Sequence, residues 1–115
     1  MSLTIYHNPR CSKSRQTLKL IEEAGAEVDI VLYLDTPPSA AQISDLLSKL
    51  GFASAQQLMR KGETIYKELG LKVETDENAL LLALSSNPKL LERPIVVKGN
   101  KAVLRRPREY APQFL

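Results

Sequence analysis

The chemically distinctive part of the chain is a short segment around its single cysteine, Cys11. Arg10, Lys13 and Arg15 lie within four positions of it, and the single histidine, His7, lies four positions before it. A thiol at a helix N-terminus faces unpaired N–H groups and the positive end of the helix dipole, which favour the thiolate. The same N–H groups and cations suit a tetrahedral oxyanion. Although an isolated cysteine is more often a small buried hydrophobe, this segment predicts an activated thiol beside an anion site.

Spacing excludes two common motifs for such a thiol. A tyrosine-phosphatase loop, C-x5-R, would need an arginine where this chain has Thr17, and a C-x-x-C dithiol would need a second cysteine where it has Ser14. One cysteine and one histidine also cannot supply four zinc ligands. Any redox cycle at Cys11 must therefore use an external thiol.

The elements around this segment alternate between strand and helix. Residues 3–7 are predicted to form a strand, and residues 12–25 a helix that is capped by Ser12 and stopped by Gly25. Residues 28–34 are a β-branched, mostly apolar run, which predicts a second strand parallel to the first in a βαβ unit. The inner face of the helix is predicted to carry Leu18, Ile21 and Ala24.

The middle of the chain is predicted to be helical and its end to return to strand. Ser39 is expected to cap a helix over residues 40–50, whose inner face carries Ile43, Leu46, Leu47 and Leu50. Further elements are expected in this order: short helices at 53–60, 66–69 and 77–85, a helical turn at 87–91, strands at 94–97 and 101–104 in an antiparallel hairpin, and a helix at 107–115. This order predicts an α/β protein with a thioredoxin-like mixed sheet and a helical insertion, in one domain over residues 1–115.

Composition and charge narrow the class of protein. The 115 residues are 43% hydrophobic, which suits one globular domain. The longest apolar run, residues 79–84, is far shorter than the roughly 20 residues of a membrane span, and no signal peptide is visible, so we expect a cytoplasmic protein. The net charge of +3 comes without an arginine-rich tract or an aromatic platform, so nucleic acid is not expected as a partner. The locally basic segment 93–108 is either a solvated surface or part of a small anion site, and we expect a monomer by default.

Four separated segments resemble one known family. Residues 6–15, Y-H-N-P-R-C-S-K-S-R, look like the active-site segment of the glutaredoxin-coupled arsenate reductases of the ArsC family. The likeness continues in the same order through residues 58–61 and 66–70, then 92–97, then 105–107. Several motifs in the right order are more specific than any one of them alone.

The resemblance implies a role for each matched residue. Cys11 would be the nucleophile that forms a thioester-like adduct with arsenate, with His7 near the thiol to help keep it ionised and with Ser14 and Arg15 completing the loop. The oxyanion would be bound by the family's three arginines, at Arg60, Arg93 and Arg106.

The resemblance also implies partners and one backbone feature. Glutathione would be the external reductant, glutaredoxin would reduce the resulting mixed disulfide, arsenite would be released, and no bound cofactor or metal is expected. The Arg93–Pro94 peptide bond would be cis, as it is in this fold. The chain departs from the pattern of the arsenate-resistance enzymes at Arg10, where they have a small residue, and at Ser12-Lys13, where they have Gly-Thr.

Two other classes of function stay open. One is a related oxidoreductase that acts on a glutathione mixed disulfide, with the arginines holding the glutathione carboxylates. The other is a regulator resembling the Spx branch, which uses this fold to bind RNA polymerase. Spx proteins usually carry C-x-x-C, which Ser14 breaks here, and a polymerase-binding module would not need three oxyanion-binding arginines.

Overall fold

The computed structural model describes residues 3–104 and divides into two compact units. The first contains the chain up to Thr36 and again from Arg93 onward, and the second contains residues 37–92. None of the helices in the described range is long and apolar enough to cross a membrane. The expectation of a single domain over residues 1–115 stays a prediction.

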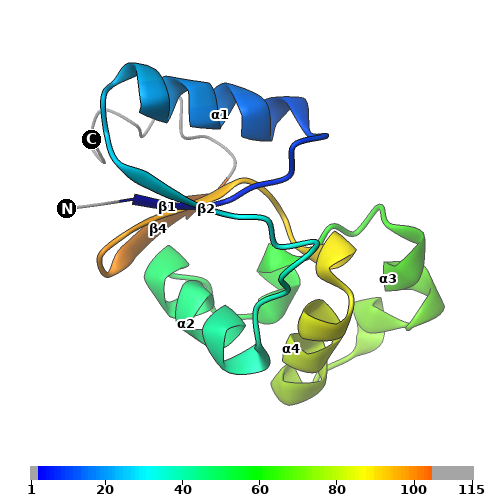
Figure 1. Cartoon of the computed structure of the whole chain (residues 1–115). Coiled ribbons are helices and arrows are strands. Elements are labelled where there is room, and N and C mark those ends of the chain that lie inside the picture. Colours follow the sequence, from blue (N-terminus) through cyan, green and yellow to red (C-terminus); the bar gives the residue numbers. More distant parts are fainter. Residues whose placement is uncertain (1–2, 105–115) are drawn as a thin grey trace. The chain divides into compact units, whose positions relative to one another are not determined.

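The first unit is built on a four-stranded mixed sheet (Figure 1). The strands β1 (Leu3–Tyr6), β2 (Val28–Val31), β3 (Ile95–Lys98) and β4 (Lys101–Leu104) are arranged in the order β2-β1-β3-β4. β1 is parallel to β2 and antiparallel to β3, and β3 and β4 form the predicted antiparallel hairpin. This mixed α/β sheet, with a helical segment between β2 and β3 in the chain, confirms the predicted fold class.

The helix α1 (Ser12–Glu23) lies against one face of this sheet (Figure 1). Ile21 from α1 forms a buried cluster with Leu3 and Ile5 of β1 and Val96 of β3. Ile5 sits opposite Val96 in the sheet, so that the central strands present a common apolar patch to the helix. Because α1 is anchored in this way, its N-terminus has a fixed position at the end of β1.

Three details of the first unit differ from the sequence prediction. The N-cap of α1 is Cys11 and not Ser12, which is the first helical residue. Ala24, predicted on the inner face of the helix, is instead the C-cap and is exposed. Gly25 follows it in the left-handed conformation (φ 76°) and ends the helix as predicted. β2 ends at Val31, three residues before the predicted end. The N–H groups of Asp35 and Thr36 turn back to the carbonyl of Leu32, so that the apolar run continues as a turn.

The second unit contains helices and short 3-10 segments. α2 (Ala40–Leu50) has the predicted bounds because Ser39 and Gln42 form a reciprocal capping box and Gly51 ends the helix in the left-handed conformation (φ 74°). Its apolar face packs against α4 (Glu77–Ser86). The core of this unit includes Ile43, Leu46, Leu58, Leu80 and Leu84.

The remaining segments are shorter than predicted or shifted by a few residues. The predicted helix at 53–60 is only the 3-10 segment η1 (Ala55–Leu58), which Ser54 and Gln57 cap reciprocally. α3 (Thr64–Glu68) and η3 (Pro88–Leu90) replace the elements predicted at 66–69 and 87–91. The 3-10 segment η2 (Leu71–Val73) was not predicted. The helix predicted at 107–115 lies outside the described residues.

Candidate active site

The loop between β1 and α1 places Cys11 at the start of the helix. His7 extends the pairing of β1 with β2, since its N–H donates to the carbonyl of Val31 at 2.9 Å. Asn8 then closes the turn in two ways. Its carbonyl accepts from the N–H of Cys11 and its side-chain Oδ1 accepts from the N–H of Arg10, both at 3.0 Å. The turn therefore holds the Cys11 backbone in the extended N-cap conformation (φ −93°, ψ 123°).

Ser14 links the first turn of α1 back to the loop. Its side chain is fully buried, and its Oγ lies 2.6 Å from Nδ1 of His7. The same Oγ accepts from the backbone N–H of Asn8 at 3.0 Å. His7 and Asn8 are themselves buried, at 6% and 8% exposure, so these hydrogen bonds are shielded from water. Ser14 thus joins two predicted site residues, His7 and Ser14 itself, to Asn8 in one buried network.

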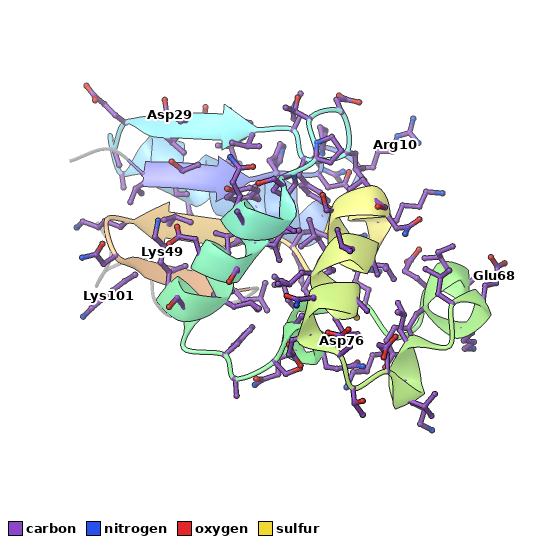
Figure 2. All side chains as sticks on the ribbon, turned by 90° about the horizontal axis from the view of Figure 1, so that it is seen from below. Arg10, Asp29, Lys49, Glu68, Asp76 and Lys101 are labelled. Carbon is purple, nitrogen blue, oxygen red and sulfur yellow. The ribbon has the colours of Figure 1, made fainter. Side chains whose placement is uncertain are left out.

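Arg15 also contacts the loop, although its side chain is exposed. Its Nη1 donates to the carbonyl of Pro9 at 2.8 Å. This bond spans the loop from the first turn of α1 and keeps a positive charge beside it. Arg10 is exposed as well and projects outward from the loop (Figure 2). Lys13, on α1, is also exposed.

The register of β3 against β1 brings Arg93, which is distant in the sequence, to the same loop. β3 runs antiparallel to β1 with Ile95 opposite Tyr6, so the two residues before Ile95 lie beside the chain that leaves β1. The Arg93–Pro94 peptide bond is cis, which confirms the prediction from the family resemblance. Nε of Arg93 is buried and has no hydrogen-bond partner among the described residues. A donor in this state is available to a bound oxygen.

The surroundings of Cys11 favour its thiolate. Burial by itself raises the pKa of the thiol, but the backbone N–H of Ser14, the side chain of Arg93 and the backbone N–H of Lys13 lower it, and the net pKa of Cys11 is below its ordinary value. A half-buried thiol whose pKa is lowered by cationic and N–H donors ionises more readily than a free cysteine, and its thiolate can attack an anionic electrophile.

The buried position of His7 determines its charge. Burial lowers the pKa of His7, the positive charge of Arg15 lowers it further, and Glu22 opposes the shift. A pKa below the usual 6.5 or so leaves the imidazole neutral at pH 7. His7 is therefore placed to act on the loop through its hydrogen bond to Ser14.

The roles of the other two arginines suggested by the sequence, Arg60 and Arg106, stay predictions. Arg60 belongs to the second unit, where its side-chain Nε lies 3.4 Å from Oε2 of Glu63. Its backbone N–H donates to the carbonyl of Leu90 at 2.7 Å. Arg106 lies outside the described residues. The cluster that the structure brings together consists of His7, Cys11, Ser14, Arg15 and Arg93.

Asn8 is the residue of the loop that sequence reasoning did not assign to the site. Its backbone and side chain form the turn that presents Cys11, and its N–H joins the Ser14 network. The available signal was the Asn8-Pro9 dipeptide, which predicts a turn and not a role beside the thiol.

Known proteins resemble this chain over nearly its whole length. The sequence profile of the ArsC family matches residues 6–114. The Escherichia coli K12 protein YfgD, which is uncharacterised, is 57% identical over 106 residues, covering 91% of this chain and 89% of its own length. An arsenate reductase of Neisseria meningitidis serogroup A is 51% identical over 108 residues, with 93% and 92% of the two chains covered.

A solved structure agrees with the same assignment. The arsenate reductase from Vibrio cholerae superposes with a TM-score of 0.94 at 43% sequence identity, covering 100% of this chain and 98% of that one. The match extends across the cysteine loop, the helical segment and the β3–β4 hairpin. Together with the family profile, this likeness shows that the chain belongs to the ArsC family.

Proposed function

We propose that this protein is an arsenate reductase in which Cys11 is the nucleophile and glutathione is the external reductant. The observation that carries the proposal is the position of the Cys11 thiol, whose pKa is lowered by the N–H groups of Ser14 and Lys13 and by Arg93. Relatives from Neisseria meningitidis and Vibrio cholerae that carry the name arsenate reductase support arsenate as the substrate.

The local charge suits an attack on arsenate. Arsenate carries one to two negative charges near neutral pH, so an approaching thiolate must overcome repulsion between like charges. The guanidinium of Arg93 offsets this repulsion, and its buried Nε, free of partners among the described residues, can donate to an arsenate oxygen. A preorganised donor of this kind acts more strongly as negative charge builds up in the transition state.

The other proposed oxyanion ligands are Arg60 and Arg106. Both follow from the family motifs that the sequence carries. Arg60 already has a carboxylate partner in Glu63, so we expect its guanidinium to exchange or share that partner when it binds the oxyanion. His7, Ser14 and Arg15 are proposed to hold the loop in the geometry that favours the thiolate.

The proposed reaction balances with two thiols and one arsenate. The Cys11 thiolate attacks arsenic, an S–As bond forms and one arsenate oxygen leaves as water. Glutathione then supplies the second sulfur, so that the S–As bond breaks, As(V) takes up two electrons and leaves as arsenite, and Cys11 remains in a disulfide with glutathione. Glutaredoxin is proposed to reduce that disulfide by thiol–disulfide exchange. Because the proposed reaction depends on reduced glutathione, we propose that the protein acts in the cytoplasm, where thiols are kept reduced.

The test is arsenate-dependent oxidation of NADPH in the presence of glutathione, glutathione reductase and glutaredoxin. Cys11→Ser should abolish the activity, whereas Lys19→Gln, which removes an exposed charge from the same helix, should retain it. NADPH oxidation with a glutathione mixed disulfide but not with arsenate would replace arsenate reduction by the related oxidoreductase activity. Equal turnover by the wild type and Cys11→Ser would overturn the proposal.

A further inference from the structure

The second unit contains a pocket whose lining residues are not those of the thiol cluster. It has a volume of about 750 Å³ and is formed by η1, α3, η2 and the adjoining chain. Small-molecule sites in proteins usually have volumes of roughly 300–1,000 Å³. The pocket is therefore larger than a single oxyanion needs and is large enough for a small organic molecule.

Two of the lining residues, Gln56 and Tyr66, are linked by side-chain hydrogen bonds. Tyr66 is buried, at 5% exposure, and its hydroxyl donates to Oε1 of Gln56 at 2.8 Å. Nε2 of Gln56 in turn donates to the carbonyl of Leu71, at the start of η2. This chain of bonds ties η1, α3 and η2 together. Gly70 connects α3 to η2 in the left-handed conformation (φ 63°), where a side chain would be strained.

The rim of the pocket is strongly cationic. Lys61, Lys67 and Lys72 all line it, are exposed, and form no ion pair with any described residue. By contrast, Lys19 and Lys49 each lie within 4.0 Å of a carboxylate oxygen one helical turn away, at 3.9 and 3.0 Å. The three pocket lysines therefore keep their charge available to a ligand.

The acidic residues near the pocket do not neutralise this charge. Glu74 is the one carboxylate in the lining, and its Oε2 accepts from the N–H groups of Thr75 and Asp76 at 3.0 and 3.2 Å. Glu68 on α3 and Asp76 at the start of α4 (Figure 2) are not among the lining residues. Asp76 instead accepts from the N–H of Asn78 as the cap of α4. Three positive charges thus face one carboxylate that is already hydrogen-bonded.

From this arrangement we propose that the pocket binds a small organic polyanion, carrying two or more phosphate or carboxylate groups. Each lysine ammonium offers three donors and no acceptor, which suits anionic oxygens. The separation of the lysines over the loop before α3, α3 itself and η2 favours a ligand with several anionic groups over a single small anion. The aliphatic lysine stems and the Tyr66 ring provide apolar walls for the body of such a molecule.

The test is a titration of the Cys11→Ser variant of the whole chain with anionic probes, monitored by the NMR chemical shifts of the backbone amides. The variant is used because removal of the thiol suppresses anion chemistry at that site. Fructose 1,6-bisphosphate is the phosphate probe, citrate is the carboxylate probe, and neutral fructose is the control. Saturable shifts at Lys61, Gly70 and Lys72 with either charged probe support the proposal, and the tighter probe identifies the preferred group. Binding should weaken as salt is added, because exposed charges are screened.

Variants at the rim provide the second arm of the test. Lys67→Gln combined with Lys72→Gln should weaken probe binding about tenfold or more, since two screened charge contacts are lost. Lys19→Gln, on α1, removes an equal charge elsewhere and should leave the affinity unchanged. Amide shifts that do not saturate, or an affinity that the double variant leaves unchanged, would overturn the proposal. Unchanged spectral dispersion in each variant shows that the fold is retained.

Discussion

Nδ1 of His7 lies 2.6 Å from Oγ of Ser14, and both side chains are buried beside the loop that carries Cys11. The same Oγ accepts from the N–H of Asn8. A single hydroxyl therefore joins the end of β1 to the first turn of α1. The backbone N–H groups of Lys13 and Ser14, which lower the pKa of Cys11, belong to that first turn. Their position at the sulfur therefore depends on the Ser14 hydroxyl.

Ser14→Ala should destabilise the loop without removing the N–H that favours the thiolate. The change leaves His7 Nδ1 and the Asn8 N–H without their partner in a buried site, which costs about 1–3 kcal/mol in the free energy of unfolding. Denaturant unfolding measures this loss. Because the backbone N–H at position 14 remains, the pKa of Cys11 should rise less than in a variant at Arg93. A larger rise in Ser14→Ala than in the Arg93 variant would contradict this division of roles.

Arg93→Gln should raise the pKa of Cys11 and slow arsenate reduction. The wild-type pKa is lowered in part by the hydrogen bond and the charge of Arg93, and glutamine retains only a neutral donor. The pH dependence of iodoacetamide alkylation measures the midpoint, which should move to higher pH. Loss of a donor at a developing oxyanion typically lowers kcat by about 10²–10³-fold. Lys19→Gln is the control, and an unchanged alkylation midpoint in Arg93→Gln would contradict the proposed contact.

His7 should titrate below the ordinary range and make stability depend on pH. Burial, followed by the charge of Arg15, lowers its folded pKa, so the unfolded chain binds a proton more readily than the folded one. The contribution of His7 to stability is therefore fully present above the unfolded pKa of about 6.5 and declines as the pH falls below it toward the folded pKa. Because the chain has one histidine, its ring proton resonances report this pKa without ambiguity. A folded pKa above the unfolded value would reverse the sign and refute the argument.

A comparison of Arg60→Gln with Glu63→Gln distinguishes a role of Arg60 in oxyanion binding from a purely structural role in its ion pair with Glu63. If Arg60 binds arsenate as proposed, Arg60→Gln should impair arsenate reduction much more than Glu63→Gln, which breaks the same 3.4 Å ion pair from the other side. Exposed or half-exposed pairs contribute about 0–1 kcal/mol, so the two variants should have similar stability. Steady-state kinetics with arsenate as the varied substrate provide the comparison, and equal kinetic losses would assign Arg60 to structure alone.

Ser39→Ala should destabilise the second unit through the start of α2. Its side chain accepts from the N–H of Gln42, and Oε1 of Gln42 accepts from the N–H of Ser39 at 2.8 Å, so the change breaks a reciprocal cap. The expected cost is about 1 kcal/mol in the free energy of unfolding. Ser44→Ala, at an exposed position inside the same helix, is the matched control and should be neutral or slightly stabilising. Thermal or denaturant unfolding distinguishes the two.

Local signals explain which elements could be predicted from the sequence. α2 and β4 have their predicted bounds because a capping serine, a terminal glycine and a short hairpin connection are encoded within a few residues. β2 was predicted too long because residues 32–34 remain apolar after the chain has turned. Apolarity alone does not distinguish a strand from an apolar turn, and here hydrogen bonds to the Leu32 carbonyl decide the outcome.

Local sequence likewise predicts one part of the site, whereas another part depends on residues that are distant in the chain. The position of Cys11 at the helix N-terminus follows from the sequence, although the cap was assigned one residue too late, to Ser12. Arg93 is 82 positions away from Cys11, and only the antiparallel register of β1 with β3 brings it to the thiol. Sequence spacing contains no such information, so Arg93 was predicted from the family resemblance. The lysine pocket was missed because it depends on the packing of three short segments.

The most direct test of the account is a single turnover followed by intact-protein mass spectrometry. The reduced protein is mixed with glutathione, with and without arsenate, in the absence of glutaredoxin. We predict that arsenate causes one glutathione to be attached to each chain at Cys11 and that an equal amount of arsenite is released. Cys11 glutathionylation that proceeds equally without arsenate, or that occurs without arsenite, would contradict the assignment of Cys11 as the nucleophile of an arsenate reductase.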